Sequence, residues 1–449
     1  MLTPQRFDIR HWQLGKFGLY IIASTGPFGS AAAQFILSLV LLRTISTAQF
    51  GAFSFLLIAA QLSWGAWSAL FCAPLPVLLS RADGPGHAAQ LATLFTANLA
   101  GAGLAFVAFV GIGIALGLSW LSAGLFAGFG AAALVRWFAR AYAYATGTPL
   151  RTAASDLTYS GIILAGTPLI WRFGDSSLAL AWGLSLVAVC AAFLPFGRTF
   201  LVGQFGRFDR TSLGGYGAVW REHSRWSLLG VVTTEATANA HVYIVTLLSG
   251  ASAFAPLAAS ALLIRPITVA MNALTEFERA RLARQIGTRD IGGAQGSVRF
   301  FRWALIATWI GTAVLTALLL GYAPGLVFPA RYDRGFLAVG ATLWMAVAAI
   351  RLLRVPESCL LQAAGEFRPL AFASVWSSGV SVVAVLLLLA LSGPLWSILG
   401  ILLGEAAFAA WIWREARRWL AAAHGPPPID IDQFVASVAL EPSPVPDAS

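Results

Sequence analysis

Charge is scarce in this sequence. Only 11% of its 449 residues are Asp, Glu, Lys or Arg, whereas soluble domains carry about 25%. A single lysine, Lys16, is present, so arginine supplies almost all of the formal net charge of +10. Hydrophobic residues make up 58% of the chain, and the mean hydropathy is +0.76. This composition excludes an ordinary soluble domain and predicts a polytopic membrane protein.

Cysteine and catalytic motifs are scarce as well. Cys72, Cys190 and Cys359 all fall in or beside apolar stretches, which favours reduced thiols packed as small hydrophobes over a disulfide frame. The chain has no GxSxG, P-loop or HExxH motif, and its hydrophilic connections are too short for an ATPase domain. We therefore expect no enzymatic activity, no cofactor and no metal. Any pumping would draw on an ion gradient, the membrane potential or consumption of the product.

Long apolar runs, in contrast, fill the chain. Twelve of them can cross about 30 Å of hydrocarbon, which predicts an all-α membrane protein with two pseudo-symmetric six-helix bundles. The expected units are an N-terminal bundle (1–197), a cytoplasmic linker (198–225), a C-terminal bundle (226–418) and a disordered Pro-rich acidic tail (419–449). The predicted spans are 17–42, 50–79, 91–117, 120–138, 157–173, 177–196, 226–248, 252–272, 300–322, 335–350, 369–391 and 395–413.

The arginines predict the orientation. With the N-terminus and every even-to-odd loop on one side, that side holds 24 of the 29 Lys and Arg residues, and Arg265 lies inside a span. Both termini are therefore predicted to be cytoplasmic. The positive charge follows from topology, with contact to anionic membrane lipids as a by-product, and no nucleic-acid partner is expected. Snorkelling to the interface explains Arg43 without a function. The other side holds Arg43, Arg172, Arg331 and Arg334.

Weak internal similarity indicates a duplication. A shift of 203 residues places 46–81 on 249–284, and a shift of 218 places 145–147 on 363–365. Chance similarity in a sequence rich in Ala, Gly and Leu is the alternative. Two halves of six spans would both enter from the cytoplasm. Such repeats are related by an axis along the membrane normal, with a substrate site where they face each other.

Two charges lie deep in the predicted spans 226–248 and 252–272. Glu235 is roughly 13 Å from one face and Arg265 roughly 20 Å from the other, so their depths nearly coincide in an antiparallel pair. Asn239 lies one turn from Glu235, and Asn272 two turns from Arg265. A charge at mid-bilayer costs about 3 kcal/mol. We therefore expect these four residues to line a substrate cavity in which Arg265 contacts an anionic group. The alternative is that Arg265 only pairs with Glu235.

Two carboxylates are candidates for ion coupling. Glu235 and Glu405, the latter in the middle of the last span, could each bind a proton or cation. The alternatives are that Glu235 is the permanent partner of an arginine and that Glu405 pairs across the two halves. Under the 203-residue shift, the apolar residues Ala32 and Leu62 occupy the positions of Glu235 and Arg265. The charge of the cavity is therefore expected to come mainly from the second half.

Short stretches resemble a known family. The segment 41–53 (LLRTISTAQFGAF) resembles the connection between the first two spans of polysaccharide biosynthesis proteins, the O-antigen flippase family. The segment 326–332 (LVFPARY) resembles the external loop after the ninth span of that family, with Pro329 in place of its usual glycine. The segments 145–147 and 363–365 fit its loops between the fourth and fifth spans of each half.

The resemblance implies the fold of the multidrug/oligosaccharidyl-lipid/polysaccharide exporter superfamily, with two bundles around a V-shaped cavity. It also implies that undecaprenyl-diphosphate-linked oligosaccharide is moved across a bacterial inner membrane by alternating access, for O-antigen, capsule or exopolysaccharide biosynthesis. A polysaccharide polymerase and a chain-length regulator are then possible partners, and Arg265 would fit a cationic cavity. Two alternatives stay open, a drug/cation antiporter of the same fold and a non-transporting subunit of a polysaccharide synthase.

Overall fold

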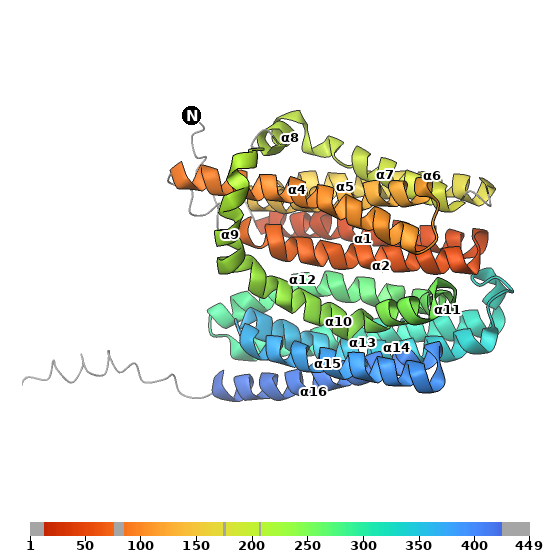
Figure 1. The fold of residues 1–449 in the computed structure, drawn as a ribbon. Helices are drawn as coiled ribbons and strands as arrows, with labels where there is room; N and C mark the ends of the chain where they lie inside the picture. The colour runs from red at the N-terminus through yellow and green to blue at the C-terminus, as the bar shows by residue number, and fades with distance from the viewer. Residues whose placement is uncertain (1–12, 76–84, 174–176, 206–207, 424–449) are drawn as a thin grey trace, which may run out of the picture.

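The computed structural model describes residues 13–75, 85–173, 177–205 and 208–423. Across these ranges the chain is helical, and no residue in them is assigned to a strand. Most of the helices lie side by side along one direction (Figure 1). This arrangement follows from the composition, because a helix satisfies its backbone N–H and C=O groups within one segment where water is absent.

The first half is built from six long helices and a short extension. Within it α1 packs along α6, α4 along α5, and α5 against α7. A π-helical turn, η2 (Ser68–Cys72), continues α2. The six helices are α1 (Gln13–Thr44), α2 (Thr47–Trp67), α4 (Pro85–Ala115), α5 (Trp120–Ala145), α6 (Pro149–Phe173) and α7 (Ser177–Ala191), which the turn η4 (Leu194–Phe196) follows.

Short helices then connect the halves, and the second half follows. The connection comprises α8 (Arg198–Phe205), η5 (Arg210–Gly215), α9 (Tyr216–Val219) and η6 (Trp220–Ser224). The second half comprises α10 (Arg225–Ser249), α11 (Ala251–Ala261), η7 (Leu262–Ile264), α12 (Arg265–Gly287), α13 (Ile291–Tyr322), η8 (Pro324–Leu326), α14 (Arg334–Ala363), α15 (Phe367–Ser392), η9 (Pro394–Trp396) and α16 (Ser397–Ala423).

The predicted fold class is confirmed. Within the described residues, each of the twelve predicted spans lies mainly in helix, and ten of these helices are long and apolar enough to cross a membrane. The other two spans lie in α6 and α10, which carry more polar residues. The boundaries of the four predicted units stay predictions, and the tail beyond Ala423 lies outside the described residues.

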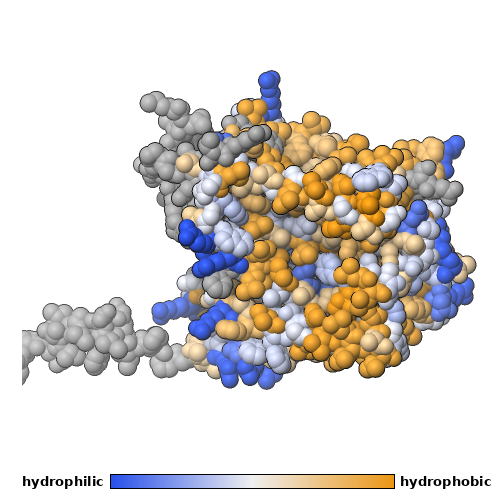
Figure 2. Space-filling view, viewed as in Figure 1, coloured by the Kyte–Doolittle hydropathy of each residue, from blue (hydrophilic) through white to orange (hydrophobic). Residues whose placement is uncertain are grey.

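The surface has the pattern expected of a lipid-embedded protein. Apolar side chains cover the middle of the face shown in Figure 2, and hydrophilic side chains gather at its two ends. Large apolar side chains such as Leu104 (73% exposed), Leu247 (78%) and Leu391 (80%) point outward. Apolar cover of this extent is rare on soluble monomers and marks a membrane-facing surface.

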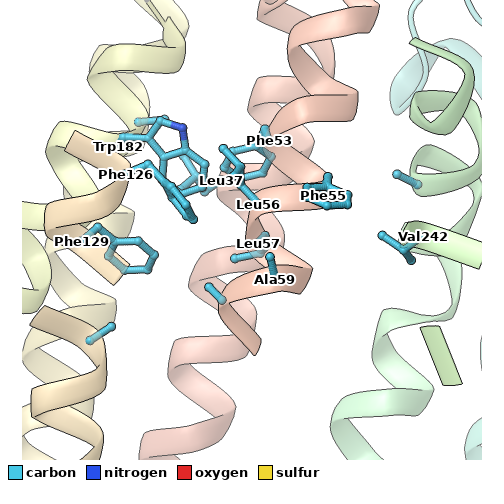
Figure 3. Close-up of a cluster of buried hydrophobic side chains, with 14 of the residues drawn as sticks. Leu37, Phe53, Phe55, Leu56, Leu57, Ala59, Phe126, Phe129, Trp182 and Val242 are labelled. Atoms are coloured by element: carbon cyan, nitrogen blue, oxygen red, sulfur yellow. The ribbon is translucent and has the colours of Figure 1, made fainter. Parts of the chain in front are cut away.

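The helix α2 lies between the two halves. Its Phe53 packs in the first half against Trp182 of α7, with ring centroids 4.9 Å apart, and Trp182 also contacts Phe126 of α5 at 4.7 Å (Figure 3). Phe55 points the other way, toward Val242 of α10. The contacts between halves are made mainly by α2 with α10 and α11, and by α1 with α12. Aromatic pairs of this kind contribute about 0.5–1.5 kcal/mol each beyond burial, and α2 packs against both halves.

Candidate functional site

Arg265 follows a break in the predicted span 252–272. The 3-10 turn η7 separates α11 from α12, and Arg265 is the first residue of α12. Pro266 accounts for the break, because it has no N–H for the carbonyl of Leu262 four residues earlier. That carbonyl accepts the N–H of Arg265 instead. Transporters commonly use the positive N-terminus of such an interrupted helix to hold an anionic group of the substrate.

The guanidinium of Arg265 has no partner among the described residues. Its side chain is half-buried, yet no hydrogen bond or ion pair joins it to them. Arg265 therefore does not pair with Glu235 in this structure, in contrast to the alternative expected from the sequence. Because arginine keeps its charge at any working pH, a carboxylate or a phosphate is the kind of group that a guanidinium without a partner would bind.

Glu235 belongs to a polar face of α10. The side-chain amide of Asn239 donates to Glu235 Oε1 (3.0 Å), and the hydroxyl of Tyr243 donates to the same oxygen (2.9 Å). The ring of Tyr243 packs edge-on against Phe55 of α2, with centroids 5.9 Å apart. This polar face therefore lies where the two halves meet. Within the described part of the chain, no cation pairs with the Glu235 carboxylate.

Asn272 lies on α12 with an exposed side chain. It shares the helix of Arg265, at the spacing of two turns that the sequence predicts. No hydrogen bond joins its side chain to another described residue. Its place in a cavity therefore stays a prediction.

Glu405 is held in an ion cluster inside the second half. Its carboxylate is 1% exposed and lies between two guanidiniums of α14, with Oε1 2.6 Å from Arg351 Nε and Oε2 3.2 Å from Arg354 Nη2. Arg351 also donates to the carbonyl of Ala238 in α10 (3.2 Å). The cluster joins α10, α14 and α16 and carries a net positive charge. This geometry favours an arginine partner over a cation site. Both partners lie in the same half as Glu405, so the expected pairing across the halves is wrong.

A similar cluster lies in the first half. Asp156 of α6 contacts both Arg136 and Arg140 of α5, the latter at 2.9 Å. Arg136 also donates to Ser155 Oγ (2.8 Å). Gly26 of α1 is required here, because a Cβ at that position would lie 2.7 Å from Asp156 Oδ2. A shift of 218 residues carries Arg136 onto Arg354. The same shift relates the loops that follow these two helices, 145–147 and 363–365.

Hydropathy did not reveal these paired arginines, for a physical reason. The predicted spans 120–138 and 335–350 end too early, since α5 continues to Ala145 and α14 to Ala363. An arginine ends a span in a hydropathy profile, but a guanidinium that is paired with a carboxylate can be buried. The spacing within each arginine pair could have indicated the clusters, because residues three or four apart lie on one face of a helix. The spacing is four residues for Arg136 and Arg140 and three for Arg351 and Arg354.

The connection between the halves is bonded to the π-helical turn η2. The wider turn leaves the carbonyl of Leu70 to accept two hydrogen bonds, from the hydroxyl of Tyr216 (2.9 Å) and from Ser224 Oγ (2.9 Å). Earlier in the connection, Thr93 of α4 donates to the carbonyl of Ser212 (3.1 Å). π-Helical turns frequently occur at functional sites, and this one links α2 directly to the segment that leads into α10.

Comparisons with known proteins identify the fold. No family model matches the sequence, and no curated protein matches it significantly. Among solved structures, the chain is similar to an inward-facing multidrug resistance MATE family transporter of the MOP superfamily. That match has a TM-score of 0.66 and 13% identity, and it covers 90% of this chain and 98% of the other.

Two further solved structures extend the comparison. The lipid II flippase MurJ in an inward closed conformation matches with a TM-score of 0.64 and 11% identity, over 88% of this chain and 87% of the other. A mutant of the Vibrio cholerae MATE transporter VcmN matches with a TM-score of 0.59 and 15% identity, over 90% and 96%. At these identities the likeness establishes the fold alone, which multidrug transporters and a lipid II flippase share.

Proposed function

We propose that this protein is a flippase that moves undecaprenyl-diphosphate-linked oligosaccharide across a bacterial inner membrane for polysaccharide biosynthesis. The anionic diphosphate and the sugars would pass between the two halves, while the prenyl chain stays in lipid. The halves would open alternately toward each side. A polysaccharide polymerase and a chain-length regulator would act on the product.

The observation that supports this function is the unpaired guanidinium of Arg265. Four other arginines deep in the helices, Arg136, Arg140, Arg351 and Arg354, each form an ion pair, with one carboxylate shared by each two arginines. Arg265 has no such partner among the described residues, although a charge inside the bilayer is costly. A diphosphate would supply the missing anion through short, charge-assisted hydrogen bonds. The fold, which the lipid II flippase MurJ shares, is compatible with a lipid-linked substrate.

A deletion strain tests this function. The wild-type gene should restore export of the glycan, whereas Arg265→Ala should cause lipid-linked oligosaccharide to accumulate on the cytoplasmic side while the protein remains inserted. Arg265→Lys, which keeps the charge but loses the bidentate geometry, should restore export partly. The matched control is Arg284→Ala, which removes an exposed arginine from the same helix and should restore export fully. Normal export with Arg265→Ala would contradict the role of Arg265.

A drug/cation antiporter is the second candidate, and Glu235 is the observation that favours it. A carboxylate without a cationic partner among the described residues suits a coupling ion, and MATE transporters share the fold. This function predicts altered drug resistance in the deletion strain together with normal glycan. The flippase predicts the reverse pattern, so one strain separates the two functions.

A further inference from the structure

The two segments 41–53 and 326–332 meet at one end of the molecule. The first connects α1 to α2 and the second lies between α13 and α14, and the arginine distribution assigns both to the external side. Phe328 and Tyr332 of the second segment are each 4% exposed and pack into the core cluster that holds Leu41, Leu42 and Ile45. Segments separated by nearly 300 residues therefore close this end together.

Two arginines join these segments reciprocally. Arg43, at the end of α1, donates to the carbonyls of Gly325 and Leu326 in the second half. Arg331 donates in the opposite direction, to the carbonyls of Leu42 and Ile45 (2.6 Å) in the first half. The last carbonyls of a helix have no partner within it and carry partial negative charge. Each half thus supplies a guanidinium that binds backbone carbonyls of the other half, at the end of α1 or in the turn η8.

The backbones also touch at this end. A Cβ on Gly51 of α2 would lie 1.8 Å from the carbonyl oxygen of Ala251, the first residue of α11. Only glycine permits this approach. The start of α2 is fixed beside it by a capping box, in which Gln49 N donates to Ser46 Oγ (3.3 Å) and Ser46 N donates to Gln49 Oε1 (3.2 Å). The two halves are therefore in direct contact at the predicted external end.

Neither guanidinium in this contact is neutralised. Arg43 and Arg331 bond to backbone carbonyls, and within the described residues neither forms an ion pair. Carbonyls are neutral acceptors, and a phosphate is a stronger partner for a guanidinium. An anion that reached this end between the halves would compete with the carbonyls for both arginines.

We propose that Arg43 and Arg331 form a latch that holds the external side closed, and that an anionic headgroup releases it by taking both guanidiniums as an exit site for phosphate. The closing role of the latch depends only on the hydrogen bonds between the halves and not on the proposed function. Release by the headgroup rests on the proposed function, since it needs a phosphate-bearing substrate. The segments that resemble family motifs would then be the two parts of one gate.

Spin-label distances test the latch. The labels replace Leu121 of α5 and Leu391 of α15, which are 66% and 80% exposed and lie at the predicted external ends of opposite halves, in a full-length chain without its three cysteines. In lipid nanodiscs, Arg43→Gln combined with Arg331→Gln should shift the closed–open equilibrium about tenfold or more toward a longer distance. Lysine at both positions should give an intermediate shift. A double glutamine variant that keeps the wild-type distance distribution and melting temperature overturns the latch.

The matched control is Arg334→Gln. It removes a third external arginine, only three residues from Arg331, that makes no side-chain hydrogen bond or ion pair to the described residues. This change should leave the distances as in the wild type. A shift equal to that of the double variant would attribute the effect to charge alone and overturn the latch.

Release is tested with farnesyl diphosphate, and farnesol serves as the neutral control. Farnesyl diphosphate should lengthen the distance in the wild type, and farnesol should not. If the latch variant opens but the diphosphate has no effect on the wild type, the exit site is overturned. The proposed flippase function is judged separately, by glycan export with Arg265→Ala.

Discussion

At the scale of single residues, charges deep in this protein fall into two groups. Arg136, Arg140, Arg351 and Arg354 each have a carboxylate as an ion-pair partner, although each cluster keeps a net positive charge. Arg265 has no counter-charge among the described residues, and neither has Glu235. An uncompensated charge inside a membrane is costly and generally marks function. The candidate site therefore differs from the clusters that hold the helices together in lacking ion-pair partners, more than in depth.

Glu235→Gln tests whether this carboxylate couples transport to an ion. Glutamine can still accept the hydrogen bonds of Asn239 and Tyr243 through its amide oxygen, so the fold should be retained. The pH dependence or cation dependence of transport should change, because the charge and the titratable group are gone. Transport measured against pH and sodium concentration checks this. An unchanged profile would leave Glu235 with a structural role only.

Glu405→Gln tests the opposite assignment. Removing the carboxylate leaves Arg351 and Arg354 close together without their counter-charge, which should destabilise the protein by about 3–5 kcal/mol. The control is Glu415→Gln, which affects a pair with Arg418 at the surface and should change stability little. Melting temperatures in detergent compare the two variants. A Glu405→Gln protein with unchanged melting and altered ion dependence would restore Glu405 as a coupling site.

At the scale of helices, one departure from regular α-helix lies within the second half and another lies where the two halves meet. The break at η7 places Arg265 at the start of α12, and the π-helical turn η2 gives the carbonyl of Leu70 to the connecting segment. Irregular backbone is tolerated at membrane depth only where protein or water satisfies it. Here the side chains of Tyr216 and Ser224 satisfy it. The connection is thus bonded to α2 in addition to leading into α10.

Tyr216→Phe combined with Ser224→Ala tests this link. The variant loses both hydrogen bonds to Leu70, which should lower the free energy of unfolding by about 1–3 kcal/mol. Hydrogen exchange over residues 208–224 should become faster. Tyr322→Phe is the control, since Tyr322 is 86% exposed. Unchanged exchange in the double variant would show that the bonds do not hold the connection in place.

The sequence was sufficient for the helices and insufficient for their ends. Hydropathy found all twelve spans because each must be apolar over about 20 residues. It placed Arg136, Arg140, Arg351 and Arg354 on the cytoplasmic side, since a window counts charge and cannot see the carboxylate that neutralises it. Asp156 and Glu405, which supply that neutralisation, come from other helices. Long-range pairs of this kind are set by tertiary packing.

The candidate site was predictable in part for the same reason. The spacing of Glu235 and Asn239 placed them on one face of a helix, and their hydrogen bond agrees with that. Tyr243, two turns beyond Glu235, follows the same spacing but was not recognised. The contact between Arg43 and the loop at Gly325 could not be read from either segment alone, because it joins residues more than 280 positions apart.

At the scale of the whole molecule, the halves are similar in topology and different in charge. Each has an arginine pair on its fourth span, but only the second half carries Arg265 and Glu235. Moving the four paired arginines into the helices leaves 20 of the 24 cytoplasmic positive residues against 4 outside, so the predicted orientation stands. This difference in charge between the halves suits the proposed substrate, which has one anionic group.

The most direct test of the flippase function is movement of the lipid itself. Purified protein in proteoliposomes should bring lipid-linked oligosaccharide from the inner leaflet to the outer one, where an added lectin detects the sugar. Arg265→Ala should slow this at least about tenfold, the equivalent of about 1.4 kcal/mol of lost substrate interaction, while Arg284→Ala matches the wild type. Wild-type protein that moves no lipid-linked sugar, or equal rates for Arg265→Ala and the wild type, would contradict the account.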